Sequence, residues 1–373
     1  MNVEFNHTLG FLQQEIDSDP HVGAQLYVSR HGNILIDTAF GEARPGVPMT
    51  PDSLNLWLSS TKPIAAVAIA QLWERGLLEL DDPVIRFIPE FEHNGKETIT
   101  IRHILTHTAG FRAPPRSEEV PWKQIVTEMC AARQEPGWVP GKKAGYHPAS
   151  SWYILGEIVR RLDGRAFSRY VREMIFEPSG MKHSWVGMTS ETFQAYGNRI
   201  ALMQDTTKSP PEPLDVKAIA TSCRPGSSGW GPIRELGKFY EMLLNRGMTG
   251  VSVGSALADP TNRILTSQSV EAITARHRAG MMDITFKAQI DWGLGFLLNS
   301  THPNSELPYG YGANASPRTF GHGGAQSSGA FCDPETGLVV AYVFNGRPGE
   351  ARHHARRKEL LEAVYVDLKM GTE

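Results

Sequence analysis

The fold is constrained most by strand-like segments at both ends of the chain, with helix-like segments between them. Residues 23–41 alternate between apolar and polar side chains around a tight turn, and residues 318–345 form two apolar runs around Asp-Pro-Glu-Thr-Gly. Both patterns are typical of antiparallel hairpins, and strand character also returns at 292–299. Apolar spacing predicts helices at 99–107, 120–133, 149–163, 167–175, 232–246 and 350–369.

We therefore expect an α/β (α+β) fold in which one antiparallel sheet is built from both chain termini and flanked by helices. Residues 1–80 and 285–373 would form this sheet lobe, and residues 81–284 an inserted, mainly helical lobe. A chain of 373 residues is long enough for two such lobes. The active site is expected between them.

Composition and charge exclude several classes of function. The net charge is -3 and no basic stripe occurs, so no nucleic-acid partner is expected. No apolar stretch reaches the roughly 18 residues of a membrane span, and the N-terminus lacks a signal-peptide pattern. A cytoplasmic protein without a membrane partner is the expectation. Cys130, Cys223 and Cys332 match no metal spacing and His103 and His107 lack a third ligand, so neither a metal nor another cofactor is expected.

The strongest chemical signal is Ser-Ser-Thr-Lys at residues 59–62. Helical spacing begins here, and Pro63 fits only in the first turn of a helix. Because residues three apart share a helix face, the amine of Lys62 can reach the hydroxyl of Ser59. A serine becomes a good nucleophile when a base takes its proton, and burial prepares a lysine for this task by lowering its pKa. The alternative is that Ser59 only caps the helix and Lys62 is solvated.

Two distant residues add to this signal. Tyr146 lies in GYHPASSWYILGEIVRRLDG, a loop that runs into an amphipathic helix, and His322 lies in TFGHGGAQSSGAF, where glycines flank the start of a strand. The chain resembles the serine β-lactamase and penicillin-binding-protein superfamily in the order of its motifs, which are Ser-x-x-Lys, then Tyr, then a basic residue before Gly. The runs GLLELDDPVIRFIPEF and IRHILTHTAGF also look like these proteins. The resemblance covers nearly the whole chain and is closest to the β-lactamase-like carboxylesterases.

The resemblance implies a role for each candidate catalytic residue. Ser59 would attack the substrate carbonyl and form an acyl-enzyme. Lys62 and Tyr146 would share the proton transfer, with either a neutral lysine or a tyrosinate as the base. The backbone N–H groups of Ser59 and Ala325 would form the oxyanion hole.

Two departures from the usual motifs shape the expected substrate. Where β-lactamases have Lys-Thr-Gly, this chain has His322, Gly323 and Gly324, which are the expected substrate-binding residues. An imidazole is mostly neutral near pH 7, unlike a lysine. The usual Tyr-x-Asn ends here in Pro148, which has no amide side chain to bind a peptide or β-lactam carbonyl. Both changes weaken a site for an anionic amide and suit a small neutral ester.

The preferred hypothesis is a serine hydrolase, a carboxylesterase acting on short or medium neutral esters. The first alternative is an amide hydrolase of the D-aminopeptidase or DD-peptidase type, or a weak β-lactamase. The second is a non-catalytic penicillin-recognition or scaffolding relative. A small-molecule ester or amide is the expected partner, and the sequence does not specify an oligomeric state. Trp57 and Trp230 are candidates for the pocket wall, although core packing explains them more simply.

Overall fold

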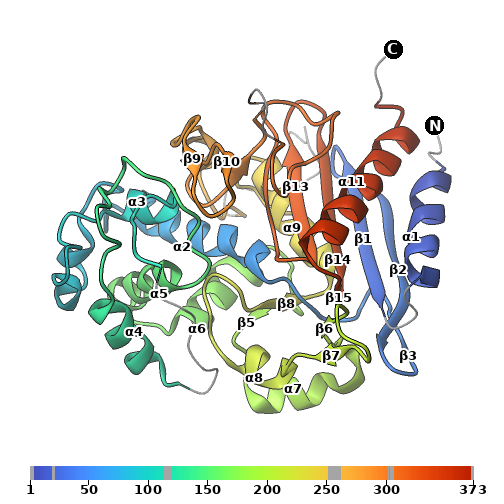
Figure 1. Cartoon of the computed structure of the whole chain (residues 1–373), viewed down its shortest axis with the longest axis horizontal. Helices are drawn as coiled ribbons and strands as arrows, with labels where there is room; N and C mark the ends of the chain where they lie inside the picture. The colour runs from blue at the N-terminus through green and yellow to red at the C-terminus, as the bar shows by residue number, and fades with distance from the viewer. Residues whose placement is uncertain are drawn as a thin grey trace.

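The computed structural model describes residues 4–18, 22–112, 120–250, 262–300, 302 and 306–370. Within these residues, the largest sheet has seven antiparallel strands that come from both ends of the chain (Figure 1). In sheet order the strands are β11 (Leu297–Leu298), β12 (Phe320–Gly323), β13 (Ser328–Asp333), β14 (Leu338–Phe344), β1 (Gly23–Arg30), β2 (Asn33–Arg44) and β3 (Val47–Pro48). The expected α/β fold, with a sheet built from both termini, is confirmed.

The centre of the sheet joins the two chain ends. β1 pairs with β2 in the predicted N-terminal hairpin and with β14 on its other side, where Ala24 lies opposite Phe344. β13 and β14 form the predicted C-terminal hairpin. Because strands on both sides satisfy its backbone, β1 is buried from Gly23 to Ser29. The two hairpins therefore form one continuous core sheet.

Helices cover both faces of this sheet: α1 (Asn6–Ser18) and α11 (Glu350–Asp367) on one face and α9 (Ile233–Leu244) on the other (Figure 1). Side chains of β14 alternate between the two faces. Val340 packs in the cluster that contains α1 and α11, whereas Val339 packs in the cluster that contains α9. α9 thus covers the sheet although it belongs to the range expected in the helical lobe. The lobe boundaries themselves stay a prediction.

The helices away from the sheet surround α2 (Lys62–Glu74), which follows a 3₁₀ turn at Ser59–Thr61. α2 packs against α5 (Ser150–Asp163), and its side chains are buried from Lys62 to Leu72. Figure 1 shows α2 running from the sheet into the helical part of the molecule. The helix that begins at the nucleophile motif is therefore a central element of the core.

Two predicted helices differ in extent from the observed ones. The helix expected at 99–107 is shortened to α3 (Ile101–Leu105), because His107 has a left-handed φ of 57°. The segment expected at 167–175 divides into α6 (Phe167–Val171) and a π turn (Arg172–Phe176). The other expected helices are confirmed within a few residues at each end.

No helix in the described part of the chain has both the length and the apolar content needed to cross a bilayer. Besides the main sheet, short strands form three smaller sheets among the described residues. The short strands are β4 (Asn55–Leu56), β8 (Gly229–Gly231) and β5 (Trp185–Val186); β15 (Gly346–Arg347), β6 (Gln204–Asp205) and β7 (Glu212–Pro213); and β9 (Met282–Asp283) with β10 (Ala288–Gln289). The remaining helices are α4 (Trp122–Ala131), α7 (Ser190–Tyr196), α8 (Val216–Thr221) and α10 (Ser267–Thr274).

Candidate active site

Ser59 is placed by a sharp turn of the backbone before α2. Leu58 has a φ of 49°, a left-handed conformation that is strained for a residue with a Cβ atom. The N–H of Thr61 then donates to the carbonyl oxygen of Leu58 at 3.0 Å, which closes the 3₁₀ turn. This turn leaves Ser59 on the wall of a cavity, with Lys62 one helical turn further along.

Lys62 is fully buried, and its Nζ atom has three neighbours. It lies 2.9 Å from the Oγ atom of Ser59 and 2.9 Å from each of the carbonyl oxygens of Pro148 and Gly226. Burial lowers the pKa of Lys62 well below its usual value. A neutral amine has two N–H groups, which match the two carbonyl oxygens, and one lone pair, which is left for the hydroxyl of Ser59. The arrangement therefore suits a general base.

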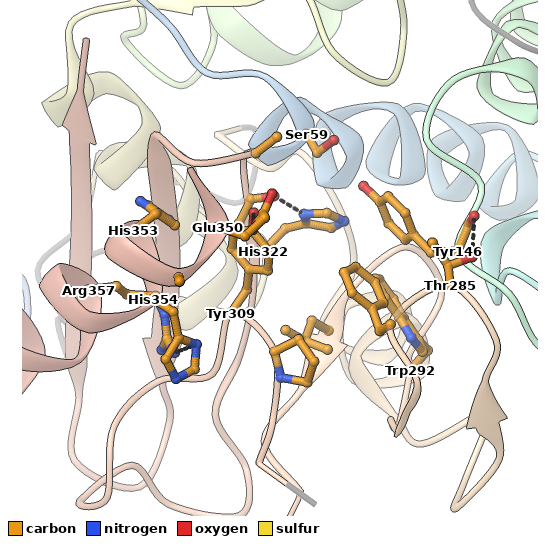
Figure 2. Close-up of a pocket in the computed structure, with 16 residues that line it drawn as sticks. Ser59, Tyr146, Thr285, Trp292, Tyr309, His322, Glu350, His353, His354 and Arg357 are labelled. Atoms are coloured by element: carbon orange, nitrogen blue, oxygen red, sulfur yellow. Dashed lines mark hydrogen bonds between the residues drawn. The ribbon is translucent and has the colours of Figure 1, made fainter. Parts of the chain in front are cut away.

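Tyr146 lies close to Ser59 on the wall of the cavity, as Figure 2 shows. Nζ of Lys62 is 5.0 Å from the centre of the Tyr146 ring. Burial raises the pKa of Tyr146 above its usual value; hydrogen bonding to Ser59 opposes this shift, and the charge of Asp283 adds to it. A phenol with a raised pKa keeps its proton at neutral pH. Of the two bases that the sequence left open, the geometry favours a neutral Lys62, with Tyr146 as a proton donor.

His322 lies on β12 and lines the cavity. Its Nδ1 atom is 2.7 Å from the carbonyl oxygen of Gly323, so Nδ1 carries the hydrogen and Nε2 keeps a lone pair. Nε2 is buried and has no hydrogen-bond partner in the part of the chain that the structure describes. Burial lowers the pKa of His322 to about 3. The side chain is therefore neutral at physiological pH.

The residues after His322 run close to the nucleophile. A Cβ atom on Gly323 would collide with the ring of Tyr309, and one on Gly324 would collide with the turn before Ser59, so both positions need glycine. Ala325 lines the same cavity as Ser59. Among the described residues, the backbone N–H groups of Ser59 and Ala325 donate to no acceptor, which leaves both available to an oxyanion.

The cavity that holds these residues has a volume of about 540 Å³. Figure 2 shows Trp292 beside Tyr146, whereas Glu350, His354 and Arg357 extend from α11 on the other side. The full lining consists of Ser59, Tyr146, Thr285, Phe286, Trp292, Leu297, Pro308, Tyr309, His322, Gly323, Ala325, Glu350, Ala351, His353, His354 and Arg357. The site thus has an aromatic wall close to the catalytic tyrosine candidate and a polar end at α11.

The walls of this cavity were not predicted from the sequence. Trp57 and Trp230 are fully buried in the core and do not line it, whereas Trp292 does. Phe286 and Tyr309 were missed as well. These wall residues come from short strands and loops, where no periodic pattern shows which side chain faces a site.

The two histidines that could have suggested a metal pair have other contacts. His103 closes a capping box with Thr100 at the start of α3. His107 is buried, and its ring centre lies 4.6 Å from that of Tyr146. No group of three or more potential ligand side chains able to hold a metal occurs in the described ranges.

Comparison with known proteins agrees with this geometry. The family model named Beta-lactamase matches residues 11–365. The chain belongs to the Beta-lactamase family. The expected resemblance to the serine β-lactamase and penicillin-binding-protein superfamily is therefore confirmed, and with it membership of a superfamily of serine hydrolases.

Individual known proteins are similar to most of the chain. The esterase/β-lactamase LipL of Mycobacterium tuberculosis is 26% identical over 87% of this chain and 77% of its own. The crystal structure of a penicillin-binding protein homolog from Caulobacter crescentus is 28% identical, covers 97% of both chains and has a TM-score of 0.79. A family VIII carboxylesterase structure shares the fold at 24% identity, with a TM-score of 0.77 over 97% of both chains.

Proposed function

We propose that this member of the Beta-lactamase family is a carboxylesterase that hydrolyses short or medium neutral esters through an acyl-enzyme on Ser59. The observation that carries this proposal is the fully buried Lys62, whose Nζ atom lies 2.9 Å from the Oγ atom of Ser59. The cavity that contains Ser59 is also lined by His322, which is neutral. The contact between Lys62 and Ser59 supports nucleophilic catalysis, and the neutral His322 supports an uncharged substrate.

The geometry supports the following steps. The neutral amine of Lys62 takes the proton of Ser59 while Oγ attacks the ester carbonyl, and the N–H groups of Ser59 and Ala325 bind the resulting oxyanion. The C–O bond to the alcohol then breaks. Tyr146 gives its proton to the leaving oxygen and recovers one from the Lys62 ammonium. Water attacks the acyl-enzyme by the same route in reverse, which releases the acid and restores the hydroxyl of Ser59.

The preference for esters over anionic amides follows from two positions. His322 carries no charge at neutral pH, so it lacks the attraction that a lysine would exert on a substrate carboxylate. Pro148 offers no side-chain amide, and its carbonyl oxygen is already bonded to Lys62. An ester also has a better leaving group than an amide and needs less help from an acid. A non-catalytic scaffold is disfavoured because Ser59, Lys62 and Tyr146 are all present.

The amide-hydrolase alternative is retained because the relative LipL is named both an esterase and a β-lactamase. A direct comparison decides between them: p-nitrophenyl esters of increasing acyl length, a chromogenic cephalosporin and a D-alanyl p-nitroanilide, each measured as kcat/KM. Ser59→Ala serves as the blank for uncatalysed and contaminant hydrolysis. The best ester should exceed both amides by orders of magnitude. If the cephalosporin matches the best ester at every pH, the amide-hydrolase function replaces this proposal.

A further inference from the structure

A buried ion pair contacts the backbone of Tyr146 and does not line the cavity. Arg278 and Asp283 are joined at 3.1 Å, with side chains 1% and 0% exposed. Arg278 also donates to the carbonyl oxygens of Thr106 at 3.1 Å and Ile290 at 3.2 Å. Burial lowers the pKa of Arg278 to about 10, so it remains charged at neutral pH. Burying two charges is favourable only when their other hydrogen-bonding groups are satisfied. The groups that bind the Asp283 carboxylate therefore show which parts of the structure it holds in place.

The second oxygen of Asp283 binds three backbone N–H groups. Its Oδ1 atom accepts from Tyr146 at 3.1 Å, from Thr285 at 3.0 Å and from Phe286 at 3.2 Å. The hydroxyl of Thr285 in turn donates to the carbonyl oxygen of Tyr146 at 3.3 Å, a bond drawn in Figure 2. The main chain of Tyr146 is therefore held at both its N–H and its carbonyl by residues 283–285.

The same turn builds one wall of the cavity. Phe286 lines the cavity, and its ring centre lies 5.0 Å from that of Tyr146. The turn connects β9 to β10, where Asp283 lies opposite Ala288. One carboxylate oxygen therefore sets the backbone positions of both the tyrosine and the aromatic residue that packs on it.

We propose that Asp283 is a positioning residue that holds the hydroxyl of Tyr146 against Ser59 and, through the same oxygen, fixes the Phe286 wall that limits acyl length. This inference rests on the proposed function, because that function assigns proton transfer to Tyr146. Asp283 is fully buried and does not line the cavity, so it acts through these two residues and not on the substrate. Loosening it should disturb proton transfer and acyl-length selection together.

The test is a double-mutant cycle between Asp283→Asn and Tyr146→Phe, with p-nitrophenyl butyrate and octanoate as substrates. Asp283→Asn should lower kcat about 10- to 100-fold, since small displacements of a catalytic group have effects of this size. In the Tyr146→Phe background its further effect should shrink to less than about 2-fold, because the group it positions is gone. The octanoate-to-butyrate ratio of kcat/KM should also change by about 3-fold or more, because Phe286 is released.

Asp291→Asn is the matched control. Asp291 is also buried and accepts from Arg276, His302 and the N–H of Gly280, and none of these lines the cavity. It should lower the melting temperature without lowering kcat or changing the ester ratio. Equal kcat losses in the two asparagine variants at equal loss of stability would overturn the proposal. The proposal would also be overturned if Asp283→Asn lowered kcat by the same factor in the Tyr146→Phe background as in the wild type.

Thr285→Val is a milder second variant if Asp283→Asn does not fold. It keeps the backbone bond to Asp283 and removes two hydroxyl bonds, one to the Tyr146 carbonyl and one accepted from Arg112. Its kcat loss of about 2- to 5-fold should vanish in Tyr146→Phe. If the wild type hydrolyses no ester, the proposed function has failed, and the same cycle is measured as the rate of Ser59 phosphonylation by a neutral p-nitrophenyl phosphonate. The predicted non-additivity applies to that rate as well, so the two failures are distinguishable.

Discussion

The Nζ atom of Lys62 lies 2.9 Å from the Oγ atom of Ser59, and the lysine has no exposed surface. No carboxylate pairs with this amine in the described part of the chain; its other two neighbours are carbonyl oxygens. A buried amine without a counter-charge is held in its neutral form, which is the form that accepts a proton. The predictions below depend on this relationship and on the residues around it.

Ser59→Ala should lower kcat for the best ester by about 10⁴-fold or more, as loss of the nucleophile does in serine hydrolases. The melting temperature should change little, because the Ser59 side chain caps no helix. Mass spectrometry after incubation with a phosphonate should place the adduct on Ser59. The control is Ser60→Ala, which loses buried bonds to the carbonyl of His322 and to Ser328. It should cost about 1 kcal/mol of stability and keep the adduct. An adduct on Ser60 in the wild type contradicts the assignment.

Lys62→Met and Tyr146→Phe should each lower kcat by about 10²- to 10⁴-fold, the usual range for general acid–base groups. Because both side chains handle the same proton, the double variant should fall well short of the product of the two losses. Steady-state kinetics of the wild type, the two single variants and the double variant measures these losses in kcat. In the wild type, kcat/KM should fall as the pH drops through the lowered pKa of Lys62, since the ammonium cannot act as a base. Fully multiplicative losses would show that the two residues serve different steps.

His322→Lys should raise kcat/KM for carboxylate-bearing amides relative to neutral esters. A neutral imidazole lacks the attraction of an ammonium, which near a partly desolvated site is worth about 1–3 kcal/mol. His322→Ala should lower ester turnover only moderately. The comparison runs from pH 5.5 to 8.5, where the pKa of about 3 keeps His322 neutral throughout. An unchanged substrate ratio in His322→Lys would remove His322 from the determinants of specificity.

The free energy of unfolding should fall as the pH drops from about 6.5 towards 3. Burial lowers the pKa of both His322 and His147 from 6.5 to about 3. Between these pH values the unfolded chain binds protons that the folded chain excludes, so stability is fully present above pH 6.5 and is lost on acidification. Urea unfolding at a series of pH values measures the slope, to which each histidine contributes up to about 1.4 kcal/mol per pH unit. His147→Gln and His322→Gln should each reduce the slope; an unchanged slope in both excludes these histidines as its source.

The sequence alone determined the local elements and the pairing of Ser59 with Lys62. The hairpins at the two ends follow from alternation around tight turns, and α5 follows from amphipathic spacing, because both depend on neighbours within a few residues. Ser59 and Lys62 are three residues apart on one helix face, so their proximity is also a local property. Tyr146 and His322 were identified only by the order of family motifs, because no local pattern links them to Ser59.

The tertiary structure alone decided the chemical state of the site and the shape of its walls. Lys62 owes its burial and its two carbonyl partners to Pro148 and Gly226, which are 86 and 164 residues further along the chain. Tyr146 and Phe286 are in contact although they are far apart in sequence, and the backbone N–H groups of both donate to Asp283. Desolvation and cavity shape arise from groups brought together by folding, and the spacing of residues along the chain does not encode which distant groups these are.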